Sequence, residues 1–511
     1  MNSMRNLISG FVSRIMLMLL GLVVRTVFIK TLGNDYLSVN GLYSNILSML
    51  SLAELGFGTA MVYSMYKPLS EKNEAKLASL MQLYSKVYRT IGFVILVLGL
   101  CLVPFLKYII KNPPEVPYLT VYYIMFLLNT VFSYWLFSYK RSILTADQKE
   151  YVCTNYRNIL SVIRSVIQIV LLIISHNYFI YLLIQMITTI AENIVVGRRA
   201  DKLYPALKIK NPQKLSQKEI GWIKHDVKGL MLSKLSHVIL NSTDNIIISA
   251  FVGVSWVGLL SNFNMIVDSV TGVLCQVTSA LSASLGNYFV EHSKEDSYAL
   301  FERVEFMNSW LYGFSSIALV TLLNPFVTLW IGEEYTLSTP IVLAITLNFF
   351  VAGYMNTLWT FRSTLGLFTQ GWYRPLIVSG LNIILSIAMG IKLGIFGVLF
   401  ATFISRACVN LWFDPLIIYK YGFERSVKLF YLMYICRIVE ILSILAVISG
   451  IKYVIMYNGI NIFNFIIMML ICVIVTIGMF WIFSHKRDEY KYFKDVLYER
   501  FLRVFLEKVK K

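Results

Sequence analysis

The sequence predicts an all-α polytopic membrane protein of about fourteen transmembrane helices, with two six-helix lobes followed by two C-terminal helices. Three observations lead to this fold class. Of the 511 residues, 57% are hydrophobic and only 14% are charged, which is too apolar for a water-soluble globular chain. Apolar runs of the ~20 residues needed to cross a ~30 Å hydrocarbon layer recur along the chain. Motifs of the first half return about 220 residues later, which indicates an internal repeat.

Each predicted span is an apolar run that ends in turn residues or charged residues. The runs lie at 11–32, 37–66, 81–106, 118–139, 152–175, 178–197, 227–252, 256–286, 303–329, 340–361, 374–392, 394–419, 432–452 and 461–484. The first run is not read as a signal peptide, because it is too long, contains Arg25 and lacks a small-residue cleavage site near "FIKTLGND". We therefore expect it to remain in the protein as a span.

Lysine and arginine gather in every second connection between spans. The cluster from Arg198 to Lys228 and the tail after Phe483 both fall on this side. By the positive-inside rule, both termini are cytoplasmic, and most of the net charge of +18 reflects topology. Since the charges flank spans and form no folded basic domain, no nucleic acid partner is expected. The basic amphipathic tail is predicted either to lie on anionic lipid of the inner leaflet or to act only as a topogenic anchor.

The repeat rests on paired motifs that occur in the same order in both halves. "TLGNDYL" faces "FVGVSWV", which pairs Gly33 with Gly253 in the first outer turn of each half. "SEKNEA" faces "HSKEDS", and "RSIL" faces "RSTL", all in inner connections. Because each repeat holds an even number of spans, the two copies point the same way and are related by a pseudo-twofold axis along the membrane normal. The predicted domains are an N-terminal lobe at 1–197, a cytoplasmic linker at 198–226, a C-terminal lobe at 227–419, the last two spans within 420–484 and the tail at 485–511.

Charged residues inside the spans are the candidate functional residues. Arg14 and Arg25 lie with Gly21 on one stripe about 40° wide of the first predicted helix. The same stripe in the second repeat consists of Lys234, Asn241 and Asn245. A lipid-facing Arg near the bilayer centre costs ~2.5 to 3.5 kcal/mol, so these residues are expected to line a polar, cationic cavity that binds substrate. The alternative is that Arg25 extends outward to the interface beside Lys30.

Further charges lie near the middle of other spans. Arg164 and Arg406 belong to the fifth and twelfth spans and join the predicted cationic cavity. The acids Glu54, Asp244 and Asp268 are candidates for coupling to an ion, although each of them could instead pair with a nearby cation. Arg437 and Glu440 are three residues apart on the thirteenth span and are predicted to pair with each other.

The sequence indicates no enzyme. No set of Ser, His and Asp and no pair of carboxylates falls in one exposed region. The P-loop pattern GxxxxGK followed by Ser or Thr does not occur, so ATP is not expected to drive the protein directly. The six cysteines lie in or beside apolar runs without paired spacing, which favours neither disulfides nor a zinc site. No catalytic residue, metal or cofactor is predicted.

The segment at 31–81, with "LAELGFGTA" and "YKPLSEKN", resembles the second-span region of Wzx-type polysaccharide flippases, which are members of the multidrug/oligosaccharidyl-lipid/polysaccharide exporter superfamily. "RSILTADQK" and "NLWFDPLIIYKYGF" extend the similarity through the twelfth span, while the last two spans match only in number. The resemblance implies a two-lobed, V-shaped bundle that opens alternately to each side. It also implies that an undecaprenyl-diphosphate-linked repeat unit moves from the inner to the outer leaflet of the bacterial cytoplasmic membrane. Membrane lipids and other polysaccharide assembly proteins would be further partners.

Three alternatives stay open. "SRIMLMLLGLVVRTVFIKTLG" shares an Arg-rich first helix with lipid II flippases, although the later motifs favour the polysaccharide branch. A cation-coupled small-molecule antiporter of the same superfamily would share the fold but typically stops at twelve spans. A polysaccharide polymerase usually needs a large outer loop for its chemistry, whereas the longest outer connections here, Lys107 to Pro117 and Trp330 to Thr339, are short.

Overall fold

The computed structural model is helical throughout, and no strand occurs among the residues that it describes. Those residues are 2–51, 57–111, 114, 116–209, 215, 221, 242–291, 293–365, 367, 370, 371, 373–457 and 459–497. Side chains are not described at 2–14, 59, 60, 206, 208, 277–291, 496 and 497.

Ten helices in the described part of the chain are long and apolar enough to cross a membrane. Two of them contain a break, at Gly33 in α1 (Asn2–Leu50) and at Gly394 in α13 (Arg374–Ile417), so each covers more than one predicted span. A further candidate is α5 (Leu119–Trp135) together with the helical segment Ser138–Ala146, and the two are bent by 46° relative to each other. The seventh predicted span, at 227–252, lies mostly outside the described residues. The predicted class, an all-α polytopic membrane protein, is confirmed.

The paired motifs of the two repeats adopt corresponding local structures. Gly33 and Gly253 both have positive φ, 85° and 148°, and both end a helical segment at the predicted outer turns. Glycine fits there because it has no Cβ to oppose a positive φ. The inner motifs "SEKNEA" and "HSKEDS" each supply a helix N-cap: Asn73 accepts from the Lys76 N–H at 3.0 Å, and Ser293 accepts from the Asp296 N–H at 3.2 Å. Side-chain oxygens at these positions satisfy N–H groups that the first helical turn leaves unpaired.

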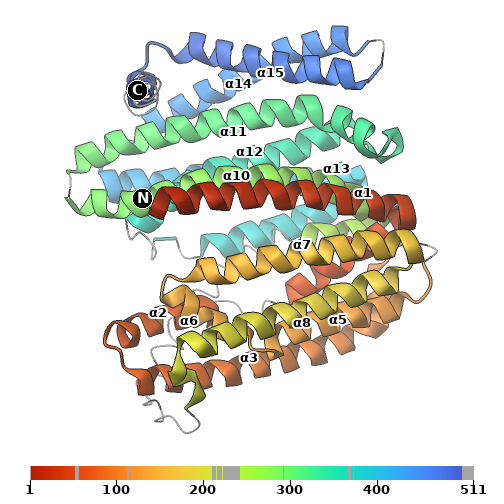
Figure 1. Ribbon diagram of the computed structural model, residues 1–511. Coiled ribbons are helices and arrows are strands. Elements are labelled where there is room, and N and C mark those ends of the chain that lie inside the picture. The colour runs from red at the N-terminus through yellow and green to blue at the C-terminus, as the bar shows by residue number, and fades with distance from the viewer. Residues whose placement is uncertain are drawn as a thin grey trace, which may run out of the picture. The chain divides into compact units, whose positions relative to one another are not determined.

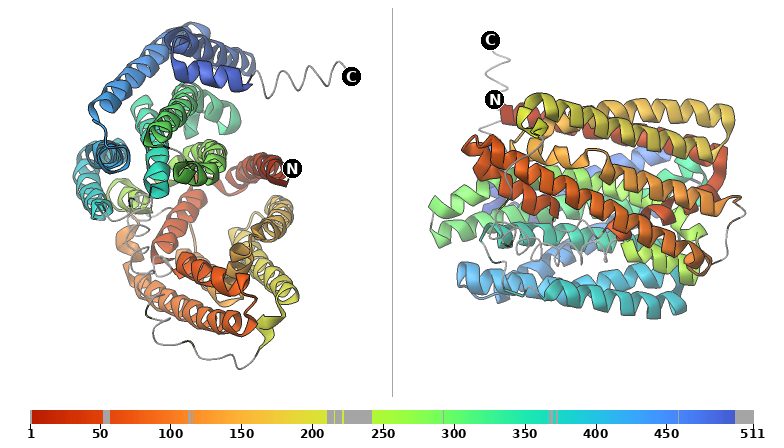
Figure 2. Two further views of the ribbon diagram at one scale, coloured as in Figure 1. Left: turned by 90° about the vertical axis from the view of Figure 1, so that its left-hand side faces the viewer. Right: turned by 90° about the horizontal axis from the view of Figure 1, so that it is seen from below.

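The chain divides into two compact units, and the first consists of residues 1–262 and 375–401. Its elements, besides α1, α5 and the first part of α13, are α2 (Phe57–Ser70), α3 (Glu74–Leu102), η2 (Val103–Phe105), α4 (Leu106–Ile109), η3 (Ser138–Lys140), α6 (Arg141–Ala146), α7 (Glu150–Ser175), α8 (Tyr178–Leu203), η4 (Pro205–Lys208), η5 (Ile248–Val252) and the start of α10 (Ser255–Glu291). α1 packs on α5 and α7, and α8 packs on α5 and α7 (Figure 1). The left view of Figure 2 looks nearly along α3, α5, α7 and α8, which run side by side.

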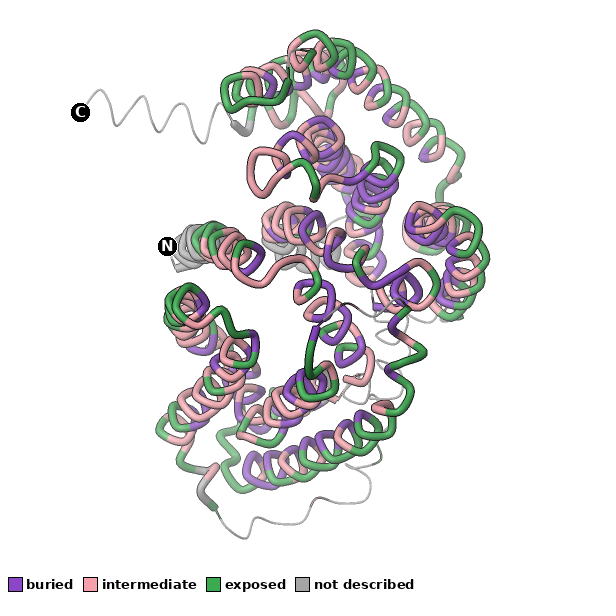
Figure 3. Tube along the Cα trace, turned by 90° about the vertical axis from the view of Figure 1, so that its right-hand side faces the viewer, coloured by how far each residue is buried: buried purple, intermediate pink, exposed green. Residues whose placement is uncertain are grey.

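The second unit consists of residues 263–374 and 402–511. Its elements are the rest of α10 and α13, with α11 (Lys294–Ile331), η6 (Glu333–Tyr335), α12 (Thr339–Thr364), η7 (Ile418–Phe423), α14 (Lys428–Ile455), α15 (Ile462–Ser484) and α16 (Asp488–Leu497). α12 is buried along most of its apolar length, and the burial of each helix can be followed in Figure 3.

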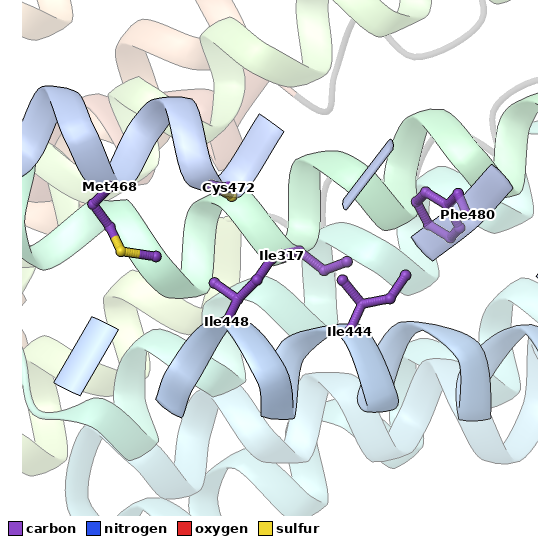
Figure 4. Close-up of a cluster of buried hydrophobic side chains, with 6 residues drawn as sticks. All are labelled: Ile317, Ile444, Ile448, Met468, Cys472 and Phe480. Carbon is purple, nitrogen blue, oxygen red and sulfur yellow. The ribbon is translucent and has the colours of Figure 1, made fainter. Parts of the chain in front are cut away.

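The two helices beyond the repeat, α14 and α15, pack on α11. Their shared core is a cluster of six buried side chains: Ile317, Ile444, Ile448, Met468, Cys472 and Phe480 (Figure 4). The predicted pair on α14 is confirmed, since Arg437 Nη1 lies 3.2 Å from a Glu440 oxygen, and Arg487 adds a second contact to Glu440 at 2.6 Å.

The boundaries of the compact units differ from the boundaries of the lobes predicted from the sequence repeat. The compact units separate after residue 262, whereas the predicted lobes at 1–197 and 227–419 were defined by repeated motifs. The lobe boundaries therefore stay a prediction.

Candidate functional site

Arg25 lies in α1 inside the first unit and is half-buried. Its Nη2 donates a hydrogen bond to Ser261 Oγ on α10 at 2.7 Å. Its Nε is buried and has no hydrogen-bond partner among the described residues, and none of their carboxylates forms an ion pair with it. A guanidinium has five N–H donors, so the hydrogen-bonding capacity of Arg25 is only partly used.

Arg164 lies on α7, which packs against both α1 and α8. Tyr181 on α8 lies near enough to Arg25 and Arg164 for both charges to act on its phenol group, and its ring packs against Phe28 of α1. The structure therefore brings two of the predicted cations into one neighbourhood. Glu192, an acid further along α8, already accepts from Arg157 Nε at 3.3 Å.

Aromatic rings adjoin this cationic pair. The Tyr181 ring lies 5.0 Å from the Phe28 ring, and Tyr178 contacts Tyr36 at 5.2 Å and Tyr122 at 4.8 Å. Edge-to-face packing of this kind fixes the ring orientations. Neither Tyr181 nor Ser261 is among the residues predicted from the sequence. The pattern "YFIY" at the start of α8 was the available signal for Tyr181, but no local pattern pointed to Ser261.

The remaining members of the predicted cavity are spread over the chain. Arg14 belongs to α1, but its side chain is not described. Asn245 is half-buried in the helical segment 242–247, and Lys234 and Asn241 lie outside the described residues. In the second unit, Arg406 on α13 is half-buried and its Nη1 donates to the Asn348 carbonyl at 3.5 Å.

The three candidate acids have different settings. Asp244 is half-buried beside Asn245 in the first unit, and Asp268 on α10 is exposed in the second. Glu54 lies outside the described residues. The role of each in ion coupling stays a prediction.

Ion pairs form at the repeat motifs "RSIL" and "RSTL" and at "NLWFDPLIIYKYGF", one of the motifs that suggested the family resemblance. Arg362 of "RSTL" donates from Nη1 to Asp414 of "NLWFDPL" at 2.7 Å, and Arg374 contacts the other Asp414 oxygen. All three side chains are at least nine-tenths buried. In the first repeat, Arg141 of "RSIL" pairs with Glu150 at 2.5 Å. These arginines therefore fasten the ends of spans and are not free to bind a ligand.

Next to this first-repeat pair, Asp147 lies in the connection between α6 and α7. Burial acts to raise the pKa of Asp147, but hydrogen bonds from Lys149 and Tyr204 bring it below its ordinary value. Burial and the hydrogen bond to Asp147 raise the pKa of Tyr204. The carboxylate is thus held in its charged form, as expected of a structural connection.

Comparisons with known proteins give the chain a family and a fold. The model of the family described as "Polysaccharide biosynthesis protein" matches residues 3–282. No match was found among curated proteins. Among solved structures, the lipid II flippase MurJ in an inward closed conformation is similar with a TM-score of 0.63 and 18% identity, covering 94% of this chain and 98% of that one.

Two multidrug transporters share the same fold. An inward-facing MATE family transporter of the MOP superfamily matches with a TM-score of 0.56 and 15% identity, covering 81% of this chain and 99% of that one. The MATE multidrug transporter DinF-BH, in a ligand complex, matches with a TM-score of 0.58 and 16% identity, covering 82% of this chain and 96% of that one. The likeness to all three structures is one of fold.

Proposed function

The chain belongs to the polysaccharide biosynthesis protein family, and on this premise we propose that it is a flippase for lipid-linked oligosaccharides. Its substrate would be an undecaprenyl-diphosphate-linked repeat unit of capsule, O-antigen or a related surface polysaccharide. The unit would move from the inner to the outer leaflet of the bacterial cytoplasmic membrane by alternating access, with both termini of the protein in the cytoplasm.

The observation that carries this proposal is the state of Arg25. A half-buried guanidinium in a spanning helix usually pairs with an acid, because an isolated charge is costly there. Arg25 instead contacts the neutral Ser261, with Arg164 nearby and both within electrostatic range of Tyr181. Guanidinium groups with unused donors suit phosphate oxygens, which they bind in pairs of charge-assisted hydrogen bonds.

The physics of the substrate requires such a site. A glycan diphosphate does not cross hydrocarbon unaided, because each buried charge and unpaired hydroxyl costs several kcal/mol. A cationic groove replaces the lost hydration while the polyprenyl tail stays in lipid. When the inside of the cell is electrically negative, outward movement of two uncompensated negative charges is favourable by roughly 4 to 5 kcal/mol at a membrane potential of ~100 mV.

Ion coupling is a second part of the proposal, motivated by acids inside the predicted spans. Asp244 and Asp268 belong to the spans at 227–252 and 256–286, and Glu54 to the span at 37–66. We expect a variant with all three changed to the corresponding amides to lose its response when proton or sodium gradients are dissipated in vesicles. An unchanged response would make these acids structural.

The direct test uses the purified full chain in liposomes that contain an undecaprenyl-diphosphate-linked oligosaccharide. Protein-dependent appearance of the glycan on the opposite leaflet supports the proposal, and deletion of the gene should make the same lipid accumulate on the inner leaflet. Flipping of lipid II alone would identify the lipid II branch. Gradient-driven drug export without lipid-linked glycan would identify an antiporter, and growth of the glycan chain would identify a polymerase.

A further inference from the structure

We propose that Ser261 is a positioning residue that ties Arg25 to a closed seam between α1 and α10, so that diphosphate binding at Arg25 favours opening of the seam. The seam consists of residues 34–41 of α1 and 255–261 of α10, all within the first unit. This inference rests on the proposed function, because it takes the ligand of Arg25 to be the diphosphate.

The two sides of the seam are equivalent segments of the repeat. In the register that pairs Gly33 with Gly253, Ser38 corresponds to Gly258 and Gly41 to Ser261. These equivalent residues meet in the structure: a Cβ added to Gly258 would collide with Ser38 Oγ, and one added to Gly41 would lie 3.9 Å from Ser261 Cβ. The seam is therefore a crossing of two related helices at small residues.

Packing holds this crossing more than hydrogen bonds do. Asn34 Nδ2 and Ser38 Oγ both reach the Ser255 carbonyl, but each distance is 3.4 Å, which is long for a hydrogen bond. Ser38 is fully buried, and Val257 is 1% exposed. Small residues allow helices to approach closely in a membrane, and a contact without strong hydrogen bonds can separate without leaving many polar groups unpaired.

A second contact closes the same end of the unit. The Lys111 N–H donates to the Ser249 carbonyl at 3.2 Å, and Ser249 Oγ donates to the Ile109 carbonyl at 2.9 Å. Lys111 Nζ donates to the Phe251 carbonyl at 2.7 Å. Ser249 and Phe251 belong to η5, a π-helical turn that ends at Gly253, and such turns interrupt helices at functional positions.

Ser261 joins the cationic site to the seam through its one hydroxyl. Ser261 Oγ accepts a hydrogen bond from Arg25 and donates one to the Gly258 carbonyl, each at 2.7 Å. Gly258 is also the residue that packs against Ser38 in the seam. A phosphate oxygen is a charged acceptor and binds a guanidinium more strongly than a hydroxyl does. Bound diphosphate would therefore compete with Ser261 for Arg25. A ligand shifts an equilibrium only when it binds the two states differently, and this competition supplies the difference.

The first experiment locks the seam. In a cysteine-free full chain, Gly41→Cys combined with Ser261→Cys places the two Cβ atoms near the 3.9 Å of the present geometry, within the range for a disulfide. We expect oxidation to stop flipping of undecaprenyl-diphosphate oligosaccharide in liposomes, and reductant to restore the rate that the double variant shows before oxidation. Gly41→Cys alone should be insensitive to oxidant. If the cross-linked protein still flips, the seam proposal is wrong while the proposed function stands. If the cysteine-free parent chain, with Gly41 and Ser261 intact, does not flip the lipid in the same liposomes, the proposed function itself fails.

The second experiment tests the link through Ser261. A Ser38→Cys reporter is buried in the closed seam and should react slowly with a water-soluble maleimide. Undecaprenyl diphosphate should raise the labelling rate. Adding Ser261→Ala should raise the rate without ligand by about tenfold, as expected for loss of a hydrogen bond to a charged group, and should shrink the ligand's effect. Ser261→Thr, which keeps the hydroxyl, should restore the ligand response. Equal ligand responses with and without the hydroxyl would overturn the role of Ser261.

Discussion

Arg25 and Arg157 are chemically alike but differ in what surrounds them. Arg157 on α7 is paired with Glu192, whereas Arg25 on α1 donates to the Ser261 hydroxyl and has no ion pair with any carboxylate of the described residues. A cation with a neutral partner can receive an anionic ligand without first breaking an ion pair. This difference in partner, and not residue type, makes Arg25 the better candidate for a binding role.

We expect Arg25→Ala to abolish flipping while the protein remains abundant in the membrane, and Arg25→Lys to restore only part of the activity. Lysine offers a point charge and lacks the paired donors of arginine. Surface polysaccharide and membrane abundance are the two quantities to measure. Arg157→Ala is the matched control: it removes a partly exposed ion pair with Glu192 and should leave both flipping and membrane abundance close to those of the wild type. Full flipping by well-expressed Arg25→Ala would show that Arg25 only extends to the interface.

Asp414 is a buried acid in the second unit that pairs with two buried arginines. Asp414→Asn replaces the carboxylate that the buried Arg362 and Arg374 share with a neutral amide, so we expect a loss of about 3 to 5 kcal/mol in the free energy of unfolding. Thermal unfolding of the purified protein in detergent measures this loss. Asp488→Asn, which removes an exposed pair with Lys491, should leave the melting temperature unchanged. Equal melting temperatures for Asp414→Asn and the wild type would contradict the structural role.

At the scale of elements, glycines with positive φ decide where α1 turns. A Cβ at Gly33 would meet nothing within 4 Å, so substitution there is opposed only by the backbone. We expect Gly33→Ala to destabilise the protein by about 1 to 3 kcal/mol, the cost of placing a residue with a Cβ in a backbone conformation of positive φ and extended ψ that is essentially restricted to glycine. Gly450→Ala on α14 is a matched control with equally open space, and it should be neutral or stabilising in the same thermal assay. If both variants unfold alike, the turn at Gly33 is not conformationally demanding.

The amphipathic helix α16 packs its aromatic side chains against α11. Phe493 stacks on Phe306 at 6.3 Å, and Tyr490 lies 6.0 Å from Trp310, both on α11. Aromatic side chains of 488–497 thus contact the protein's own second unit. Contact of the tail with anionic lipid stays a prediction, and it concerns the basic side chains and the residues beyond 497.

At the scale of the whole molecule, the orientation of the chain in the membrane determines in which direction a substrate would be moved. In a cysteine-free chain, we expect Tyr108→Cys, at an exposed position of an outer connection, to react with an impermeant thiol reagent in intact cells. Lys72→Cys, at an exposed position of an inner connection, should react only after permeabilisation. External labelling of Lys72→Cys in intact cells would refute the orientation with both ends inside.

The sequence by itself determined the class, the spans and the local features. Apolar runs, the turns at Gly33 and Gly253 and the Arg437–Glu440 pair were all readable because each depends on residues close together in the chain. A helical period of 3.6 residues also put Arg14 and Arg25 on one stripe, since it fixes faces within one helix.

Only the tertiary structure decided which side chains on other helices each helix face contacts. Ser261 is 236 residues from Arg25, and Asp414 is 52 residues from Arg362. Tyr181 comes near Arg25 because α7 and α8 pack where they do. The physical reason is that the helical period gives the angle of a side chain around its own helix, whereas its partners depend on which helices pack together and at what depth, and these follow from side-chain packing summed over the whole bundle.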